Sequence, residues 1–215
     1  MEENPLGWSS KAQCICHGSI RSARRTTLVG TSKNVPSPDT PPWKPLLAIL
    51  GRTDVPPERQ AQEIWRSAYA ERGASLVDEF ASPAVAAACG LVSTSNDVLA
   101  ASAAFSGHLA TAGRAGFANE IARRALLRAV STNQGVAGFA RELFAEATSY
   151  YVSRDLPSFV GARGRVESVS RGMEFKTQIK AIVRTTVATT GQPSPDPDGW
   201  ANYAATVIRA LRGLA

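Results

Sequence analysis

Aromatic residues are scarce in this sequence, whereas alanine is abundant. Phe, Trp and Tyr make up 7% of its 215 residues. Aromatic and β-branched residues favour β-strands, and alanine has the highest helix propensity. The composition therefore predicts tightly packed helices rather than a β-sandwich or a barrel.

Cysteine is equally scarce, and the three cysteines are Cys14, Cys16 and Cys89. An odd and sparse number excludes a disulfide framework and is typical of a reducing cytoplasm, where we expect this protein. The CICH sequence at 14–17 looks like half of a metal site, and a structural zinc ion needs four ligands, commonly from two such pairs. Because Cys89 and His108 lie in apolar helical segments, we expect neither a metal nor another cofactor.

Histidine occurs only twice, at His17 and His108, and this limits the kinds of catalysis that the chain can support. A nucleophilic Ser or Cys needs an oriented base, and the apolar neighbours of His108 indicate a packing or surface role instead. The GARGRV sequence at 161–166 lacks the Lys-Ser/Thr pair of a phosphate loop. We therefore expect a non-enzymatic protein, with an unrecognised site within 150–172 as the alternative.

Long apolar runs are missing as well. No apolar run reaches the ~18–20 residues that a membrane span requires. The N-terminal residues also lack the apolar region of a secretory signal. The sequence thus predicts no membrane partner.

Residues 1–53 differ from the remainder in charge and in pattern. They hold seven Lys or Arg against three acidic residues, which accounts for +4 of the net charge of +6. Prolines crowd 36–45, and no helical or strand periodicity is sustained. Such a segment buries too little apolar surface to offset the entropy lost on ordering. We expect a disordered, Pro-rich basic N-terminal arm over 1–53 and a helical domain over 54–215, with Trp43 and the apolar residues 46–50 docked on that domain.

Helical periodicity begins near Pro56 and continues almost to the end of the chain. Apolar spacing, caps and Gly or Pro stops predict an all-α domain, an irregular bundle of about six to eight helices. The expected helices cover about 57–72, 75–81, 83–89 (ended by Gly90), 97–112 (capped by Asn96), 117–130, 135–153, 173–189 and 197–211.

The helix over 135–153 has the clearest apolar stripe, which includes Leu143, Ala147 and Tyr150. We expect Tyr150 to face inward and Tyr151, about 100° away around the helix axis, to be partly exposed. The residues that follow combine aromatic and charged side chains, which is the composition of an interaction hot spot. The predicted partner-binding residues are Tyr151, Arg154, Asp155 and Phe159. The alternative is a helix end that packs on the core, with Arg154 and Asp155 paired locally.

Arginines recur along the helices of the central region, and two interpretations are open. A basic strip for nucleic acid would contain Arg114, Arg123, Arg124, Arg128 and Arg141. However, Glu120, Glu142 and Glu146 interleave with them, which favours a mixed, salt-bridged face. We therefore expect any nucleic-acid binding to be weak and to depend on the basic arm together with the Arg-rich helix predicted over 117–130.

The stretch GTSKNVPSPDTPPW at 30–43 resembles the Gly-Thr-Ser, proline-rich opening of the B component of the Qat anti-phage defence systems. The resemblance implies a non-enzymatic bacterial protein that works with other proteins of the same system, namely an ATPase, a QueC-like enzyme and a TatD-like nuclease. The expected recognition residues of the arm are Gly30, Thr31, Ser32 and Trp43. That family opens near its N-terminus, whereas 29 residues precede Gly30 here. Two starts of translation are therefore open, Met1 and a start codon at Leu28 or Val29, and with the second the removal of Met would expose Gly30.

Overall fold

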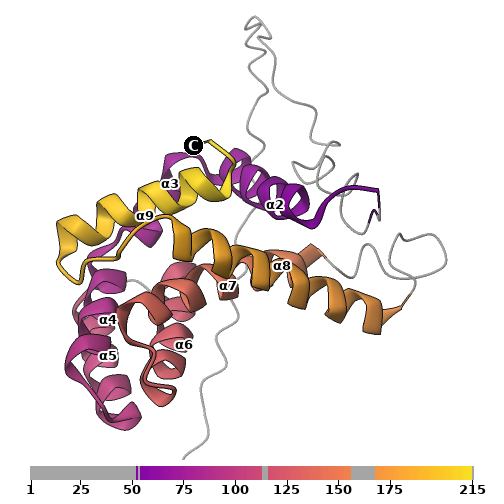
Figure 1. The fold of residues 1–215 in the computed structure, drawn as a ribbon. Coiled ribbons are helices and arrows are strands. Elements are labelled where there is room, and N and C mark those ends of the chain that lie inside the picture. Colours follow the sequence, from indigo (N-terminus) through magenta and orange to yellow (C-terminus); the bar gives the residue numbers. More distant parts are fainter. Residues whose placement is uncertain (1–51, 53, 113–115, 156–167, 215) are drawn as a thin grey trace, which may run out of the picture. The chain divides into compact units, whose positions relative to one another are not determined.

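The computed structural model describes residues 52, 54–112, 116–155 and 168–214, which form eight helices and no strand (Figure 1). The helices are α2 (Pro57–Arg72), α3 (Ala74–Phe80), α4 (Pro83–Thr94), α5 (Val98–Ala112), α6 (Phe117–Ser131), α7 (Gly135–Asp155), α8 (Val169–Thr189) and α9 (Pro197–Leu211). The prediction of an all-α, irregular bundle is confirmed. Apart from Arg52, the basic arm lies outside the described residues, and so do Gly30, Thr31, Ser32 and Trp43.

Side-chain caps explain where several helices begin. Asp196 accepts a hydrogen bond from the backbone N–H of Gly199 at 2.7 Å, as expected for the start of α9. Ser82 and Ser168 accept equivalent bonds at the first turns of α4 and α8. At α5 the prediction was one residue off, because Asp97 rather than Asn96 accepts from the N–H of Leu99, at 2.8 Å. Each cap satisfies a backbone donor that the helix itself leaves unpaired.

Two predicted boundaries differ from the structure. Helix α4 continues through Gly90 to Thr94, because Cys89 and Val92 on either side of the glycine face the core. Burial of these side chains outweighs the roughly 1 kcal/mol by which glycine disfavours a helix. Helix α8 starts at Val169, four residues earlier than predicted, because Ser168 supplies its cap.

Helix α7 is the centre of the domain, since it packs most extensively against α8 and α6 and also contacts α2 and α4. Large side chains on its neighbours meet it in an aromatic core. The ring of Trp65 from α2 lies 5.8 Å from that of Phe144 on α7, and its Nε1 donates to Thr148 Oγ1 at 3.0 Å. A buried indole N–H requires such a partner. Trp200 of α9 finds one in the carbonyl of Phe80, at 2.8 Å.

The remaining helices form two groups around α7. Helices α4, α5 and α6 pack against one another on one side, and α2, α3 and α9 form the other group (Figure 1). Helix α8 lies along α7 and also contacts α2 and α9. Every helix therefore has at least one packed face, and α7 has several.

Residues 74–94 are apolar and long enough to cross a membrane by length and composition, with a mean hydropathy of 1.3. The prediction that no apolar segment reaches this length is therefore corrected, since Asp78 and Glu79 are its only charged residues. In the structure this segment comprises α3 and α4, separated at Ala81 and Ser82. Its large apolar residues, Leu76, Phe80 and Val85, are buried in the core of the domain.

Candidate interaction surfaces

The two tyrosines near the end of α7 lie opposite to the prediction. Tyr151 is 2% exposed, whereas Tyr150 is 47% exposed. The C-terminal half of α7 faces Trp65, and this turns Phe144, Thr148 and Tyr151 inward, at the i, i+4 and i+7 spacing of one helix face.

The other predicted partner-binding residues are one exposed arginine and two residues whose side chains are not described. Arg154 pairs with Glu71 of α2 at 3.1 Å, and its guanidinium lies 5.6 Å from the centre of the Tyr151 ring. The side chain of Asp155 and all of Phe159 lie outside the described residues. Tyr151 is therefore not available to a partner, and its position fits the alternative of a helix end packed on the core.

Tyr150 takes the exposed position that Tyr151 was expected to hold. Its ring lies 4.5 Å from that of Phe117, at the start of α6, and 5.8 Å from that of Tyr151. The guanidinium of Arg72 lies 5.8 Å from the Phe117 ring and pairs with Glu79. We call the set Phe117, Tyr150, Arg72 and Arg154 the Tyr150 surface.

Beneath this surface, two buried oxygens have no hydrogen-bond partner among the described residues. They are the hydroxyl of Tyr151 and one carboxylate oxygen of Glu79. Burial raises the pKa of Tyr151 to about 12, although nearby Arg72 acts in the opposite direction. The Tyr151 hydroxyl is therefore protonated at neutral pH.

The arginines of α6 form ion pairs, as the mixed-face interpretation predicts. Glu120 binds Arg123 at 3.0 Å and Arg124 at 2.9 Å, at the i+3 and i+4 positions of the same helix. Arg128 reaches across to Glu142 of α7 at 3.4 Å. The prediction is thus confirmed for these three arginines, while Arg114 lies outside the described residues.

A charged seam joins α6, α7 and α8. Glu142, only 5% exposed, accepts two hydrogen bonds from the guanidinium of Arg184 at 2.8 and 3.0 Å. Glu146, one turn further along α7, pairs with Lys180 and lies 3.9 Å from Arg128. Burial opposes ionisation of Glu142, but the hydrogen bonds and charge of Arg184, with Arg128 and Lys180, hold its pKa below the ordinary value of 4.5.

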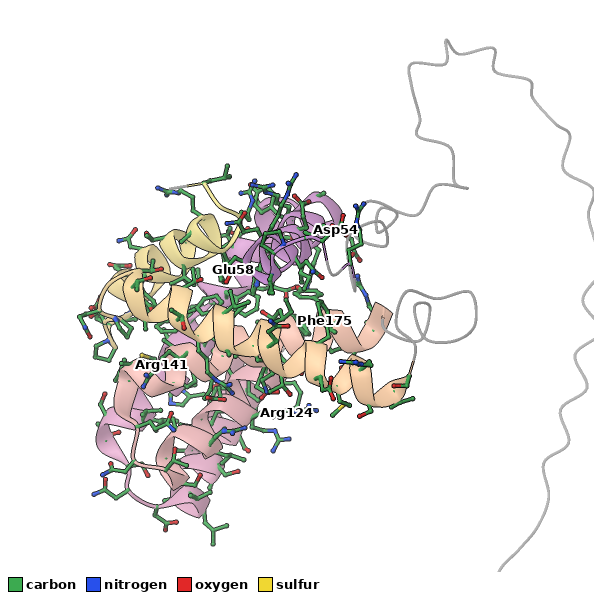
Figure 2. The ribbon with its side chains drawn as sticks, turned by 45° about the vertical axis from the view of Figure 1, so that its right-hand side comes forward. Asp54, Glu58, Arg124, Arg141 and Phe175 are labelled. Atoms are coloured by element: carbon green, nitrogen blue, oxygen red, sulfur yellow. The ribbon has the colours of Figure 1, made fainter. Side chains whose placement is uncertain are left out.

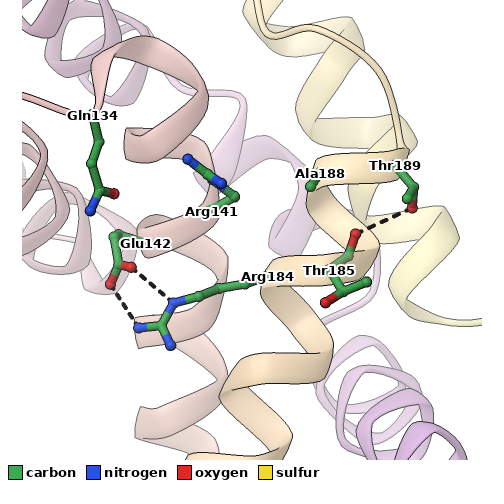
Figure 3. A pocket seen from close by; sticks show the side chains of 7 residues that line it. All are labelled: Gln134, Arg141, Glu142, Arg184, Thr185, Ala188 and Thr189. Carbon is green, nitrogen blue, oxygen red and sulfur yellow. Dashed lines mark hydrogen bonds and ion pairs between the residues drawn. The ribbon is translucent and has the colours of Figure 1, made fainter.

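Arg141 stands apart from the charged seam, in a groove between α7 and α8. One hollow of about 360 Å³ is lined by Gln134, Arg141, Glu142, Arg184, Thr185, Ala188 and Thr189 (Figure 3). A second hollow, of about 220 Å³, is lined by Ala137, Arg141, Val187, Ala188, Gly191, Gln192, Pro193 and Tyr203. Arg141 and Ala188 line both hollows, which we together call the Arg141 groove.

From the sequence we predicted Arg141 as part of a basic strip, whereas Arg184, Lys180 and the groove were not predicted. The spacing of Glu120, Arg123 and Arg124 was enough to predict pairs within one helix. Pairs between α7 and α8 have no such signal, because their partners lie 34 and 42 residues apart.

Groups of three or more His, Cys, Asp or Glu side chains that could hold a metal ion are absent from the described part of the chain. Cys89 is buried on α4 and His108 is exposed on α5, so these two candidate ligands do not converge. The CICH and GARGRV sequences lie outside the described residues.

Comparisons with known proteins identify no relative of this chain. No protein-family model matches the chain, and no curated protein or solved structure is significantly similar to it.

Proposed function

We propose that this chain is a helical interaction protein that binds a protein partner through the Tyr150 surface. The observation that carries the proposal is the 47% exposure of Tyr150, an aromatic ring fixed on one side by Phe117 and Tyr151. Tyrosine and arginine are enriched among the residues that contribute most to protein–protein binding.

The setting of Tyr150 favours binding because little conformational freedom remains to be lost. The ring sits on a helix of 21 residues, and Arg154 beside it is already held by Glu71. Arg72 is held in the same way by Glu79. Ordering a side chain at an interface costs about 0.5–1.5 kcal/mol, so residues that are ordered beforehand bind more tightly.

The partner we propose is another protein of a multi-component bacterial system such as anti-phage defence, in the cytoplasm. The support is the resemblance of residues 30–43 to the Qat B opening, in which Gly30, Thr31, Ser32 and Trp43 are the expected recognition residues. In this proposal the arm and the Tyr150 surface contact proteins of the same system, and neither surface performs catalysis.

The direct test is affinity capture of the full chain from native cells, followed by titration with the partner identified. Tyr150→Ala is expected to weaken the complex by about 1–2 kcal/mol, or about 5-fold to 30-fold. Leu99→Ala is the matched control, because Leu99 is 79% exposed but lies on α5, away from this surface. If Tyr150→Ala binds as tightly as the parent chain does, the Tyr150 surface is not the binding site.

A second candidate function is nucleic-acid binding, and the distribution of charge favours it. Helices α6, α7 and α8 carry nine Lys or Arg against five Asp or Glu, whereas α2 to α5 carry three against five. Figure 2 shows Arg124 and Arg141 on the side formed by α6 and α7. However, most of these cations already have an acidic partner, which reduces the number left to neutralise phosphates.

The two functions differ in their response to salt. Nucleic-acid binding that neutralises several phosphates weakens steeply as salt increases. We expect the full chain to bind DNA or RNA weakly and to lose that binding when residues 1–53 are deleted. Tight, strongly salt-dependent binding by residues 54–215 would make nucleic-acid binding the primary function.

A further inference from the structure

We propose that the Arg141 groove binds a small organic anion, a ligand with a carboxylate or phosphate group that pairs with Arg141. This inference is independent of the proposed protein–protein function, because the groove and the Tyr150 surface share no residue.

Arg141 has no acidic partner among the described residues. Its Nε donates only to the carbonyl of Ala137, one turn earlier in the same helix, at 3.3 Å. By contrast, Arg128, Lys180 and Arg184 each lie within 4 Å of Glu142 or Glu146. Arg141 is also half-buried, so its charge is less well hydrated than that of a fully exposed arginine. An anion in the groove would replace the missing hydration.

The charged residues around the groove also carry an excess of positive charge. Glu142 and Glu146 pair with three cations, Arg128, Lys180 and Arg184. The seam therefore has one uncompensated positive charge, and Arg141, which lines both hollows, adds a second (Figure 3). Electrostatics therefore favours a ligand with one or two negative charges.

The lining indicates what the rest of the ligand is like. The larger hollow has polar walls from Gln134, Thr185 and Thr189, and the Glu142–Arg184 ion pair lines it as well. The smaller hollow has apolar walls from Val187 and Pro193 beside Tyr203. The two threonine hydroxyls donate to helix carbonyls at 3.2 and 3.3 Å, so their oxygens remain free to accept from a ligand. The larger volume, about 360 Å³, falls within the usual range for small-molecule sites, about 300–1,000 Å³.

Gly138 keeps Gln134 at the edge of this groove. A Cβ at position 138 would overlap the side chain of Gln134, which lies over the glycine on the first turn of α7. Gly138→Ala is therefore expected to displace Gln134 while leaving Arg141 in place. This variant separates the amide at the mouth of the groove from the charge within it.

The test is a titration of the full chain with inorganic phosphate and, separately, with succinate at constant ionic strength, followed by thermal denaturation. At least one anion is expected to raise the melting temperature in a saturable manner, because a ligand that binds only the folded state stabilises it. Arg141→Ala should lower the affinity at least about 10-fold. Arg209→Ala is the matched control, since Arg209 is exposed on α9 and has no ion pair among the described residues, and it should leave the affinity unchanged.

Two further measurements keep the test decisive if Arg141→Ala folds poorly. Arg141→Lys retains the charge but loses the planar fork, so it should weaken binding without abolishing it. Amide chemical shifts in the parent chain should change at Thr185 and Gly191 and not at Leu99. The proposal is overturned if neither anion stabilises the chain, or if the same shift persists in Arg141→Ala.

Discussion

Two faces of α7 contact their neighbours through different chemistry. On one face, near the middle of the helix, Glu142 and Glu146 form ion pairs with α6 and α8. On another face, which extends to the C-terminal end of the helix, Thr148 and Tyr151 contact Trp65 of α2 through a hydrogen bond and ring packing. The rings supply burial energy, whereas the ion pairs mainly define which helices pair and in which register. The same helix is thus held strongly on one face and selectively on the other.

The largest effect on stability is expected when the aromatic contacts of Tyr151 are removed. Tyr151→Ala removes a ring that contacts Trp65 and Phe117, and should lower the free energy of unfolding by about 3–5 kcal/mol. Denaturation in urea measures this decrease in the free energy of unfolding. Tyr150→Ala, the neighbouring exposed ring, should cost less than about 1 kcal/mol. Equal losses in the two variants would contradict the different burial of the two tyrosines.

A smaller loss is expected at the charged seam. Glu142→Ala leaves Arg184 without its carboxylate, and should cost about 1–3 kcal/mol, less than for a fully buried pair because Arg184 is partly exposed. Glu120→Ala removes an exposed carboxylate that also binds two arginines, so it serves as the control, with a loss below about 1 kcal/mol. If Glu120→Ala lowers the free energy of unfolding as much as Glu142→Ala does, burial of Glu142 does not determine how much these ion pairs stabilise the fold.

The seam also predicts a dependence of stability on pH. The folded-state pKa of Glu142 lies below its ordinary value of 4.5, so the folded state binds a proton less readily than the unfolded state does. Its contribution is therefore complete above the unfolded pKa and is lost as pH falls through the folded pKa. Glu142→Gln should flatten the decline in the free energy of unfolding below about pH 4.5. An unchanged acid profile would show that other carboxylates dominate.

The smallest expected change concerns the hydroxyl of Tyr151. Because this buried group has no hydrogen-bond partner among the described residues, Tyr151→Phe removes an unsatisfied polar atom and keeps the ring. Stability should rise slightly or change by less than about 1 kcal/mol. Thermal denaturation of this variant beside Tyr151→Ala measures the change, and a loss approaching that of the alanine variant would indicate that the hydroxyl makes a stabilising hydrogen bond, for which nearby Arg72 is the described donor.

The sequence predicts α9 better than α7 for a physical reason. The stripe of Trp200, Tyr203 and Val207 is buried as expected, because α9 has a single packed face. Helix α7 has several, so its apolar pattern does not specify which turn points to α2, and the two tyrosines were exchanged. The charged seam depends on tertiary contacts, and Arg184 resembles any solvated helix residue in the sequence. Helix existence was thus predictable, but the facing of a central helix and its charged partners were not.

The reactivity of the buried Cys89 thiol reports local opening of the native domain. Its thiol is fully buried on α4, its sulfur lies 3.8 Å from the carbonyl of Ser194, and burial raises its pKa to about 12. Alkylation requires a thiolate that a reagent can reach, so Cys89 reacts only when the segment leading into α9 lifts away from α4. The alkylation rate of the peptide that contains Cys89 therefore measures how often the contact between α4 and the segment leading into α9 opens. No engineered probe is needed.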